Sequence, residues 1–356
     1  MRPESFAFFK QLMATTSPSG FEAPGQKVWC EYARQFADEV RTDAYGNAVA
    51  IVNGQGDPKI VLDGHSDELG MMVKYIDDKG FIYVQRIGGV DPALVRGKRV
   101  DIHAKDGPVR GVIGATAIHL QPREGEKKAP KWPEIFLDIG AADAEAAKQR
   151  VSVGDPVTFV EGFEMIGEHV GVARAFDNRV GTWCAVEALR LAAEKREGLK
   201  CAVYACSSVM EEIGGAGAAM NAANLKPDAA IVVDVTHATD TPGVDMKEHG
   251  QIKMGQGPTL SFGRENHPAV NELLIAAAAD EDIPIQREAF GLAGGTNALS
   301  YYSKEGGIPS AVVGLPNRYM HTTVEMIDLR DMERIAELLS AAVVRVTSGQ
   351  RFKVAV

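Results

Sequence analysis

The sequence predicts an α/β protein whose sheet is interrupted by a β-rich insertion. Strand-like apolar runs and helical patterns occupy residues 1–69 and return in residues 164–356. Between them, in residues 70–163, the apolar runs are short and alternating or β-branched, and turns such as KDGP at 105–108 separate them. Several short strands at close spacing favour a small barrel or sandwich. We therefore expect one discontinuous α/β domain formed by both ends of the chain and one inserted β-rich domain.

The composition of the chain suits a soluble protein of two domains. It has 356 residues, of which 45% are hydrophobic and 24% are charged. The net charge of −10 argues against nucleic acid as a partner, because phosphate binding needs a basic face. No apolar run approaches the ~20 residues of a membrane span, and Glu4 and Lys10 interrupt the apolar N-terminal stretch. We expect a cytoplasmic protein that binds neither nucleic acid nor membrane.

The cysteine pattern indicates buried thiols rather than a disulfide framework or a zinc site. The four cysteines form no C-x-x-C pair, and three of them lie within apolar segments. They are Cys30, Cys184, Cys201 and Cys206.

The first 69 residues predict a helix and then two strands. Phe6, Phe9, Leu12 and Met13 recur at helical spacing, which indicates an amphipathic helix packed on the fold. The sequence AYGN at 44–47 is a turn signal and separates the segments on either side of it.

The insertion predicts strands at residues 81–87 and 99–104, and 141–150 is its only helical pattern. The charged, proline-bearing segment 121–134 predicts a mobile loop. No cluster of histidines and carboxylates follows its strands, so we expect it to serve assembly rather than chemistry. We expect a contact face of exposed apolar residues such as Met71, Met72 and Phe81.

After residue 164 helices and strands alternate. The expected elements are a helix at 180–191, a strand at 201–210, a glycine- and alanine-rich helix, a strand at 229–235, a helix at 268–280, a strand at 310–315 and a helix from about Asp328.

Histidines and carboxylates follow the apolar strands at several points. They are His65 and Asp67 after the strand Ile60 to Leu62, Glu211 and Glu212 after 201–210, Asp234 at the end of 229–235, His321 after 310–315, and Asp177 before the helix at 180–191. The carboxyl ends of strands in an open α/β sheet are where ligands bind. Each residue has an alternative interpretation: Asp177 as a helix N-cap, the glutamates as a solvated strand end, and His321 as a hydrogen-bonded loop residue. One shared site explains all these positions together, whereas the alternative interpretations would all have to hold at once. We therefore favour one site.

Mixed imidazole and carboxylate ligands suit divalent Zn, Co or Mn. There are more carboxylates than one ion needs, which indicates two ions roughly 3.5–4 Å apart that share a bridging carboxylate. Adjacent residues on a strand face opposite directions, so one of Glu211 and Glu212 can bind metal while the other transfers protons.

Seven ordered motifs resemble the M42 family of dinuclear metallo-aminopeptidases, which includes the tetrahedral and glutamyl aminopeptidases. They are SPSGFE (17–22), DAYGN (43–47), DGHSDELG (63–70), ARAFDNRVG (173–181), MEEIGGAGA (210–218), VVDVTHATDTPG (232–243) and MHTTVE (320–325). The resemblance implies a three-layer, zinc-peptidase-like catalytic domain and a β-rich dimerisation domain at 70–163. It also implies removal of N-terminal residues from short peptides, and dimers that build dodecamers around an internal chamber.

The resemblance also implies a role for each site residue. His65 and Asp234 would hold one ion, and Glu212 and His321 the other, with Zn or Co expected and Mn as the alternative. Asp177 would bridge the two ions, Glu211 would act as general base, and Asp67 would orient His65. Asn297 departs from the family, which usually has an acidic residue after Gly-Thr, so it bears on the substrate pocket.

Other functions fit the sequence less well. Gly214, Gly215 and Gly217 resemble a phosphate cradle, but no G-K-S/T follows, and close backbone packing is the favoured interpretation. A glycosidase would need carboxyl groups ~5–9.5 Å apart, which adjacent glutamates pointing apart do not provide. Another dinuclear amide hydrolase, such as a deacylase or carboxypeptidase, stays open, as does an inert assembly protein.

Overall fold

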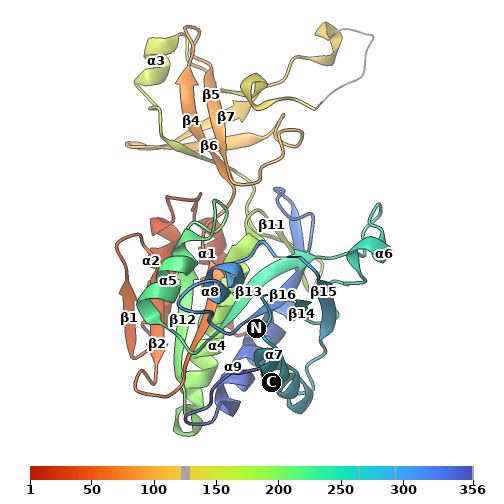
Figure 1. Cartoon of the computed structure of the whole chain (residues 1–356). Coiled ribbons are helices and arrows are strands. Elements are labelled where there is room, and N and C mark those ends of the chain that lie inside the picture. The colour runs from red at the N-terminus through yellow and green to blue at the C-terminus, as the bar shows by residue number, and fades with distance from the viewer. Residues whose placement is uncertain (122–128, 264, 293, 355–356) are drawn as a thin grey trace.

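The body of the molecule is a mixed β-sheet with helices on both faces, and a β-barrel stands above it (Figure 1). The computed structural model describes residues 1–121, 129–263, 265–292 and 294–354. The α/β class with a β-rich insertion, expected from the sequence, is confirmed. No helix of these ranges is long and apolar enough to cross a membrane.

The main sheet takes strands from both ends of the chain. Its spatial order is β1-β2-β12-β3-β13-β16-β17-β11-β10, with β14 paired to β16 and β15 to β14. The central pairs β12–β3, β3–β13 and β13–β16 are parallel, so the carboxyl ends of these strands meet at one edge. The strands are β1 (Glu39–Thr42), β2 (Ala48–Val52), β3 (Lys59–His65), β10 (Glu164–Ile166), β11 (Val170–Ala173), β12 (Ala202–Ser208), β13 (Ala229–His237), β14 (Thr259–Gly263), β15 (Gln286–Phe290), β16 (Ser310–Arg318) and β17 (Glu325–Asp328).

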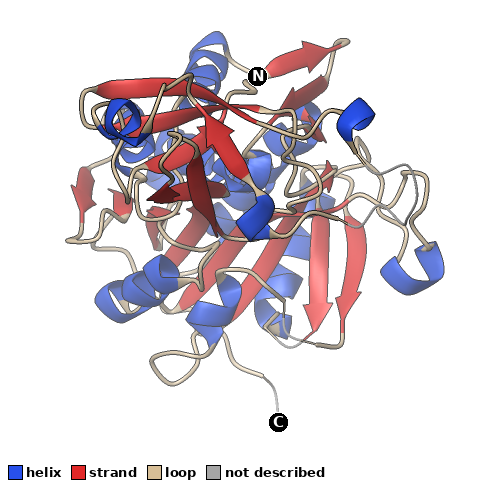
Figure 2. Ribbon diagram, turned by 90° about the horizontal axis from the view of Figure 1, so that it is seen from above, coloured by secondary structure: helices blue, strands red, loops and turns tan. Residues whose placement is uncertain are grey.

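Helices cover the sheet as two outer layers, which Figure 2 shows from above. One face packs against the larger group of helices, and its buried residues include Phe9, Trp29, Trp183 and Leu339. These helices are α1 (Pro3–Ala14), α2 (Ala23–Ala33), α4 (Phe176–Glu194), α7 (Pro268–Asp280) and α9 (Leu329–Arg345). The opposite face carries α5 (Ala216–Leu225) and α8 (Ala298–Tyr302), whose buried residues pack on β2, β3, β12, β13 and β16. The short helix α6 (Met246–His249) has no buried residue.

The insertion forms a closed, antiparallel six-stranded barrel, which abolishes sheet edges. Its own core contains Met71, Val84, Ile102, Leu137 and Val157. The strands follow the order β4-β5-β8-β7-β6-β9, and they are β4 (Gly70–Ile76), β5 (Ile82–Ile87), β6 (Arg99–Ala104), β7 (Gly107–Ile113), β8 (Phe136–Asp138) and β9 (Pro156–Phe159). The α-helix of the described insertion, α3 (Ala144–Lys148), occupies part of the helical pattern expected at 141–150, and short 3-10 turns lie at Ile118–Leu120 and Trp132–Glu134.

Several elements were not expected from the sequence, and the longest of the helices among them is α2. The first 69 residues were predicted to hold one helix, but α2 is a second one. Its sequence begins Ala-Pro-Gly, which is typical of a turn. Pro24 lies in the first helical turn, where no backbone N–H is needed for an intrahelical bond. Burial of Trp29 and Ala33 then stabilises the helix despite the glycine.

The prediction that Met71 lies on an exposed contact face of the barrel is wrong. This side chain is fully buried in the barrel core, because alternate residues of β4 face inward. Met72 and Phe81 are half-buried. The expected mobile loop at 121–134 falls partly on residues 122–128, which lie outside the described residues. The expectation of buried, free cysteines is confirmed for all four.

Candidate metal centre

The seven residues proposed from the sequence lie together at the carboxyl edge of the parallel strands. β3 ends at His65, β13 carries Asp234, and the turn after β12 carries Glu211 and Glu212. Asp177 lies at the start of α4 and His321 follows β16. Two groups have ligand atoms close enough for an ion: His65 with Glu211 and Asp234, and His65 with Asp177 and Glu212. The expectation that strand ends would converge is therefore confirmed.

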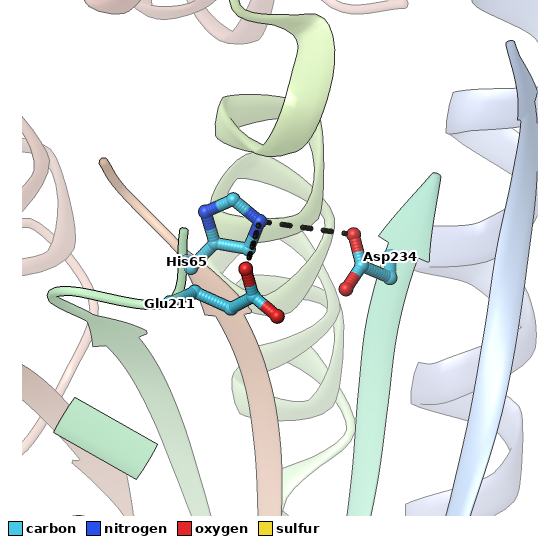
Figure 3. A group of neighbouring side chains, drawn as sticks. All are labelled: His65, Glu211 and Asp234. Carbon is cyan, nitrogen blue, oxygen red and sulfur yellow. Dashed lines mark ion pairs between the residues drawn. The ribbon is translucent and has the colours of Figure 1, made fainter. Parts of the chain in front are cut away.

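His65 presents one ring nitrogen to carboxylates. Its Nε2 atom lies 3.1 Å from Oδ1 of Asp177, 3.8 Å from Oε2 of Glu211 and 3.8 Å from Oδ1 of Asp234. Figure 3 shows the last two of these contacts, with the side chains converging from three separate segments. The other ring nitrogen, Nδ1, lies 3.3 Å from Oδ1 of Asp67. A carboxylate at Nδ1 fixes the ring orientation and leaves Nε2 as the nitrogen that can bind an ion.

Asp177 lies between the two imidazoles. Its Oδ1 atom faces His65, and its Oδ2 atom lies 3.2 Å from Nε2 of His321. Oε2 of Glu212 is 3.8 Å from the same nitrogen of His321. Each oxygen of one carboxylate therefore faces a different imidazole, which is the arrangement that a bridging ligand requires.

The backbone around Asp177 departs from a regular helix start. The regular turns of α4 begin only after Asn178, whose side-chain Oδ1 accepts the backbone N–H of Gly181 at 3.0 Å. Asp177 itself has φ −72° and ψ 105°, and its peptide bond to Asn178 is cis. The side-chain amide of Asn178 donates a hydrogen bond to the backbone carbonyl of Val233, 2.8 Å away. The alternative interpretation of Asp177 as the helix N-cap is therefore wrong, because its carboxylate faces the imidazoles instead.

Glu211 and Glu212 diverge for a different reason than the one predicted. β12 ends at Ser208, so neither glutamate is on a strand. Met210 takes the left-handed conformation at φ 56°, and the chain turns there. Glu211 lies toward His65, and Glu212 toward His321. The turn, rather than strand alternation, separates their directions.

Asp67 holds this turn in place. Its buried carboxylate accepts the backbone N–H of Glu211 at 3.0 Å and that of Glu212 at 3.1 Å. It also accepts the hydroxyl of Ser19 at 2.6 Å. One side chain thus fixes His65 and both glutamates relative to one another.

Glu325 holds Asp177 and His321 in place, as Asp67 holds the two glutamates. No role for Glu325 was expected from the sequence. Its two carboxylate oxygens accept the backbone N–H of Asp177 at 3.0 Å and that of His321 at 2.9 Å. The side chain is 2% exposed. An acidic residue four positions after His321 in the motif MHTTVE was the available signal.

The electrostatics of the cluster favour a bound cation. Burial raises the pKa of Glu211 to about 7 and raises those of Glu212 and Asp234 well above their usual range. The pKa of Asp177 is lowered because, despite burial, both imidazoles hydrogen-bond to it. Among the described residues, no lysine or arginine forms an ion pair with these carboxylates, and Oε1 of Glu212 is buried without a partner. Imidazoles and excess carboxylates of this kind fit divalent cations.

The barrel contributes to the wall of the centre through the residues that follow β5. A Cβ atom at Gly89 would lie 2.9 Å from Nδ1 of His321, and one at Gly88 would meet Leu69 and Glu212. Only residues without a side chain allow this close approach. Two glycines of the insertion thus shape the space beside Glu212 and His321, while the candidate ligands of both groups come from outside the insertion.

A cavity of about 530 Å³ opens onto the cluster from the side of β13 and β14. Its walls include Thr236, Ser261, Glu265 and Phe290. Asn297, the departure noted in the sequence, does not line the cavity. It is 1% exposed, and its amide donates to the buried carboxylate of Asp63 at 2.8 Å.

The family model for the M42 glutamyl aminopeptidase matches residues 46–338. The chain belongs to this family. Lysyl aminopeptidase of Pyrococcus furiosus is 30% identical over 93% of this chain and 94% of its own length. The enzyme is thus an aminopeptidase, and the recognition made from the seven motifs is confirmed.

Solved structures of M42 relatives share the fold over nearly the whole chain. The TET aminopeptidase of a marine sediment Thaumarchaeota archaeon is 32% identical, with a TM-score of 0.91 over 96% of each chain. The TET1 peptidase of Pyrococcus horikoshii is 26% identical, with a TM-score of 0.86 over 96% of this chain and 100% of its own. That peptidase can assemble into a tetrahedron or a large octahedral shell.

Proposed function

We propose that this M42 aminopeptidase uses two divalent metal ions to remove N-terminal residues from short peptides. The observation that carries the proposal is Asp177, whose two oxygens lie 3.1 and 3.2 Å from the imidazoles of His65 and His321. Glu211 lies beside the first imidazole and Glu212 beside the second. An inert assembly protein would have no need of this arrangement.

The ligand set divides into two halves. His65 and Asp234 would hold one ion, Glu212 and His321 the other, and Asp177 would bridge them. Zn or Co suits these ligands, with Mn as the alternative. When bound, the ions supply Lewis acidity toward the scissile carbonyl and lower the pKa of the attacking water.

Glu211 is the proposed general base. It takes a proton from the attacking water and returns it to the amine that leaves. Burial places its pKa at about 7, which suits a group that must both accept and donate a proton near neutral pH. Asp67 orients His65 through Nδ1 and positions Glu211 through its backbone N–H.

The substrate amine would enter through the cavity of about 530 Å³. Its charged walls are acidic among the described residues, with Glu211, Glu212, Asp234 and Glu265 facing no lysine or arginine. An ammonium group is attracted to such a surface. The free N-terminus of a peptide therefore suits this side of the centre.

Metal content and substrate preference test the proposal together. We expect inductively coupled plasma mass spectrometry to find two ions per subunit, and aminoacyl-nitroanilides to be hydrolysed with Zn, Co or Mn. Peptides with a blocked N-terminus should resist hydrolysis. Cleavage of N-acylated substrates or of C-terminal residues would instead identify a deacylase or a carboxypeptidase.

Gly89→Ala should weaken one metal site selectively. The added methyl group would lie 2.9 Å from the His321 ring, so the ring or the backbone at residue 89 must shift, which changes the position of His321 relative to Glu212 and Asp177. We expect the affinity for the second ion to fall roughly tenfold or more, as loss of ligand orientation does elsewhere. Gly162→Ala is the matched control, because no atom lies within 4 Å of its added Cβ. Competition titration with a metal chelator measures both, and equal affinities in the two variants would contradict the role of Gly89.

The insertion is proposed to mediate dimers that assemble into a closed dodecamer in the cytoplasm. Support comes from the TET1 peptidase of 26% identity, which forms closed shells. We expect light scattering at micromolar concentration to give a mass far above 38.2 kDa. Deletion of residues 70–163 should prevent assembly. A fully active monomer would show that the barrel has another purpose.

A further inference from the structure

A second cavity lies on the other side of the cation cluster. Its volume is about 230 Å³, and Asp177 and His321 border it as well as the larger cavity. The barrel supplies one wall, from the segment between β5 and β6, and the loop before β17 supplies the other. The apolar residues that line it are Leu69, Val90, Leu94, Val95, Phe159 and Val324.

Most charged groups of this second cavity are already paired, and the exception is Asp91, which is exposed and whose Oδ1 atom accepts the backbone N–H of Ala93. Arg174 forms an ion pair with Glu68, and Nζ of Lys98 contacts Glu161 at 2.9 Å. Glu325 accepts the two backbone N–H groups described above. The surface left for a ligand is therefore mainly aliphatic, with Leu94 51% and Val324 46% exposed at its rim.

The two cavities differ in the chemistry they can accept. The larger one presents carboxylates that, among the described residues, no lysine or arginine neutralises, and it suits an ammonium group. The smaller one presents aliphatic side chains and suits an apolar group. A peptide whose scissile bond lies at Asp177 and His321 would therefore place its N-terminal residue in the first cavity and the next residue in the second.

We propose that the second cavity is the subsite for the residue immediately after the scissile bond, and that it selects apolar side chains there. The inference rests on the proposed aminopeptidase function and adds a preference on the leaving side of the bond. It also gives the barrel a part in substrate selection, because Val90, Leu94 and Val95 come from the insertion.

The test compares peptides X-Leu-Gly, X-Lys-Gly and X-Glu-Gly, together with the amide of X, on the metal-loaded enzyme. X is one fixed residue that the wild type hydrolyses well. We expect kcat/KM for X-Leu-Gly to exceed those of both charged peptides about tenfold or more, from burial of the leucine side chain. Failure to find any residue X whose amide or peptides the wild type hydrolyses would refute the proposed function itself, and equal values for the three peptides of a hydrolysed X would refute only the subsite.

A charge introduced at the rim makes the test specific. Leu94→Asp should raise the ratio of X-Lys-Gly to X-Leu-Gly about three- to fivefold, and Leu94→Lys should raise the ratio of X-Glu-Gly to X-Leu-Gly similarly. Val153→Asp and Val153→Lys are matched controls, because Val153 is an exposed apolar residue of the insertion outside the cavity. Unchanged ratios in the Leu94 variants would overturn the proposal. A change confined to the preference for X would also overturn it. If light scattering showed that the Leu94 variants no longer assemble while the ratios stay unchanged, the cavity would be an interface between subunits instead.

Discussion

Glu211→Gln should retain both metal ions and lose activity by roughly 10²–10⁴-fold, the usual contribution of a general acid–base group. The amide has nearly the same shape as the carboxylate but cannot accept the proton from water. The backbone N–H of residue 211 would still donate to Asp67, so the turn and its neighbour Glu212 should stay in place. The loss should appear in kcat, since the group acts on the transition state rather than on substrate binding.

Steady-state kinetics and metal analysis on the same preparation check this prediction. Glu248→Gln is a suitable control, because Glu248 is exposed and lies outside the cluster. Activity within a few-fold of wild type would remove Glu211 from the proton-transfer role. A loss of metal in Glu211→Gln would make it a ligand instead.

Asp177→Asn should lower the occupancy of both ions, whereas His321→Ala should chiefly empty one. The two oxygens of Asp177 face different imidazoles, so a single substitution removes a charged ligand from each half of the centre. The loss of metal affinity should exceed the roughly 10–100-fold loss that follows substitution of a residue hydrogen-bonded to a ligand. His321 faces only Asp177 and Glu212 among these residues, so its removal leaves His65 and Asp234 in position.

Isothermal titration of the metal-stripped variants with Zn and with Co would count the remaining sites. Two intact sites in Asp177→Asn would rule out the bridging role. Loss of both sites in His321→Ala would contradict the division of the ligands into two halves.

The convergence of the site could be predicted because parallel strands bring their carboxyl ends to one edge. The positions of His65, Asp234 and Glu211 follow from that geometry once the strands are located in the sequence. The interruption of the sheet could also be predicted, because the short alternating apolar runs of 70–163 differ from the continuous apolar runs of buried parallel strands.

The remaining features depend on contacts between distant segments, which no local pattern encodes. Glu325 acts through the backbone N–H groups of Asp177 and His321, so its place in the motif MHTTVE signals an acidic residue near the site but not which groups it contacts. Gly89 is one of many glycines, and only the folded chain shows that its missing side chain makes room for His321. The helix α2 was missed because burial outweighs the turn tendency of its first residues.

The interrupted sheet also sets the order in which the chain can fold. All six barrel strands lie between Gly70 and Phe159, so the barrel closes within one continuous segment through the pairing of β4 with β9. β3, in contrast, pairs with β12 and β13, which follow the whole insertion. Such distant pairings form slowly, because loop closure costs entropy before any contact is gained.

Metal binding should accordingly report on the last step of folding. The proposed ligands extend from His65 to His321, and they meet only when the parallel core of the sheet is complete. An ion that binds there stabilises the finished sheet and not a chain that has formed its barrel alone. Metal supply during synthesis would then favour complete molecules over those halted with the first strands still unpaired.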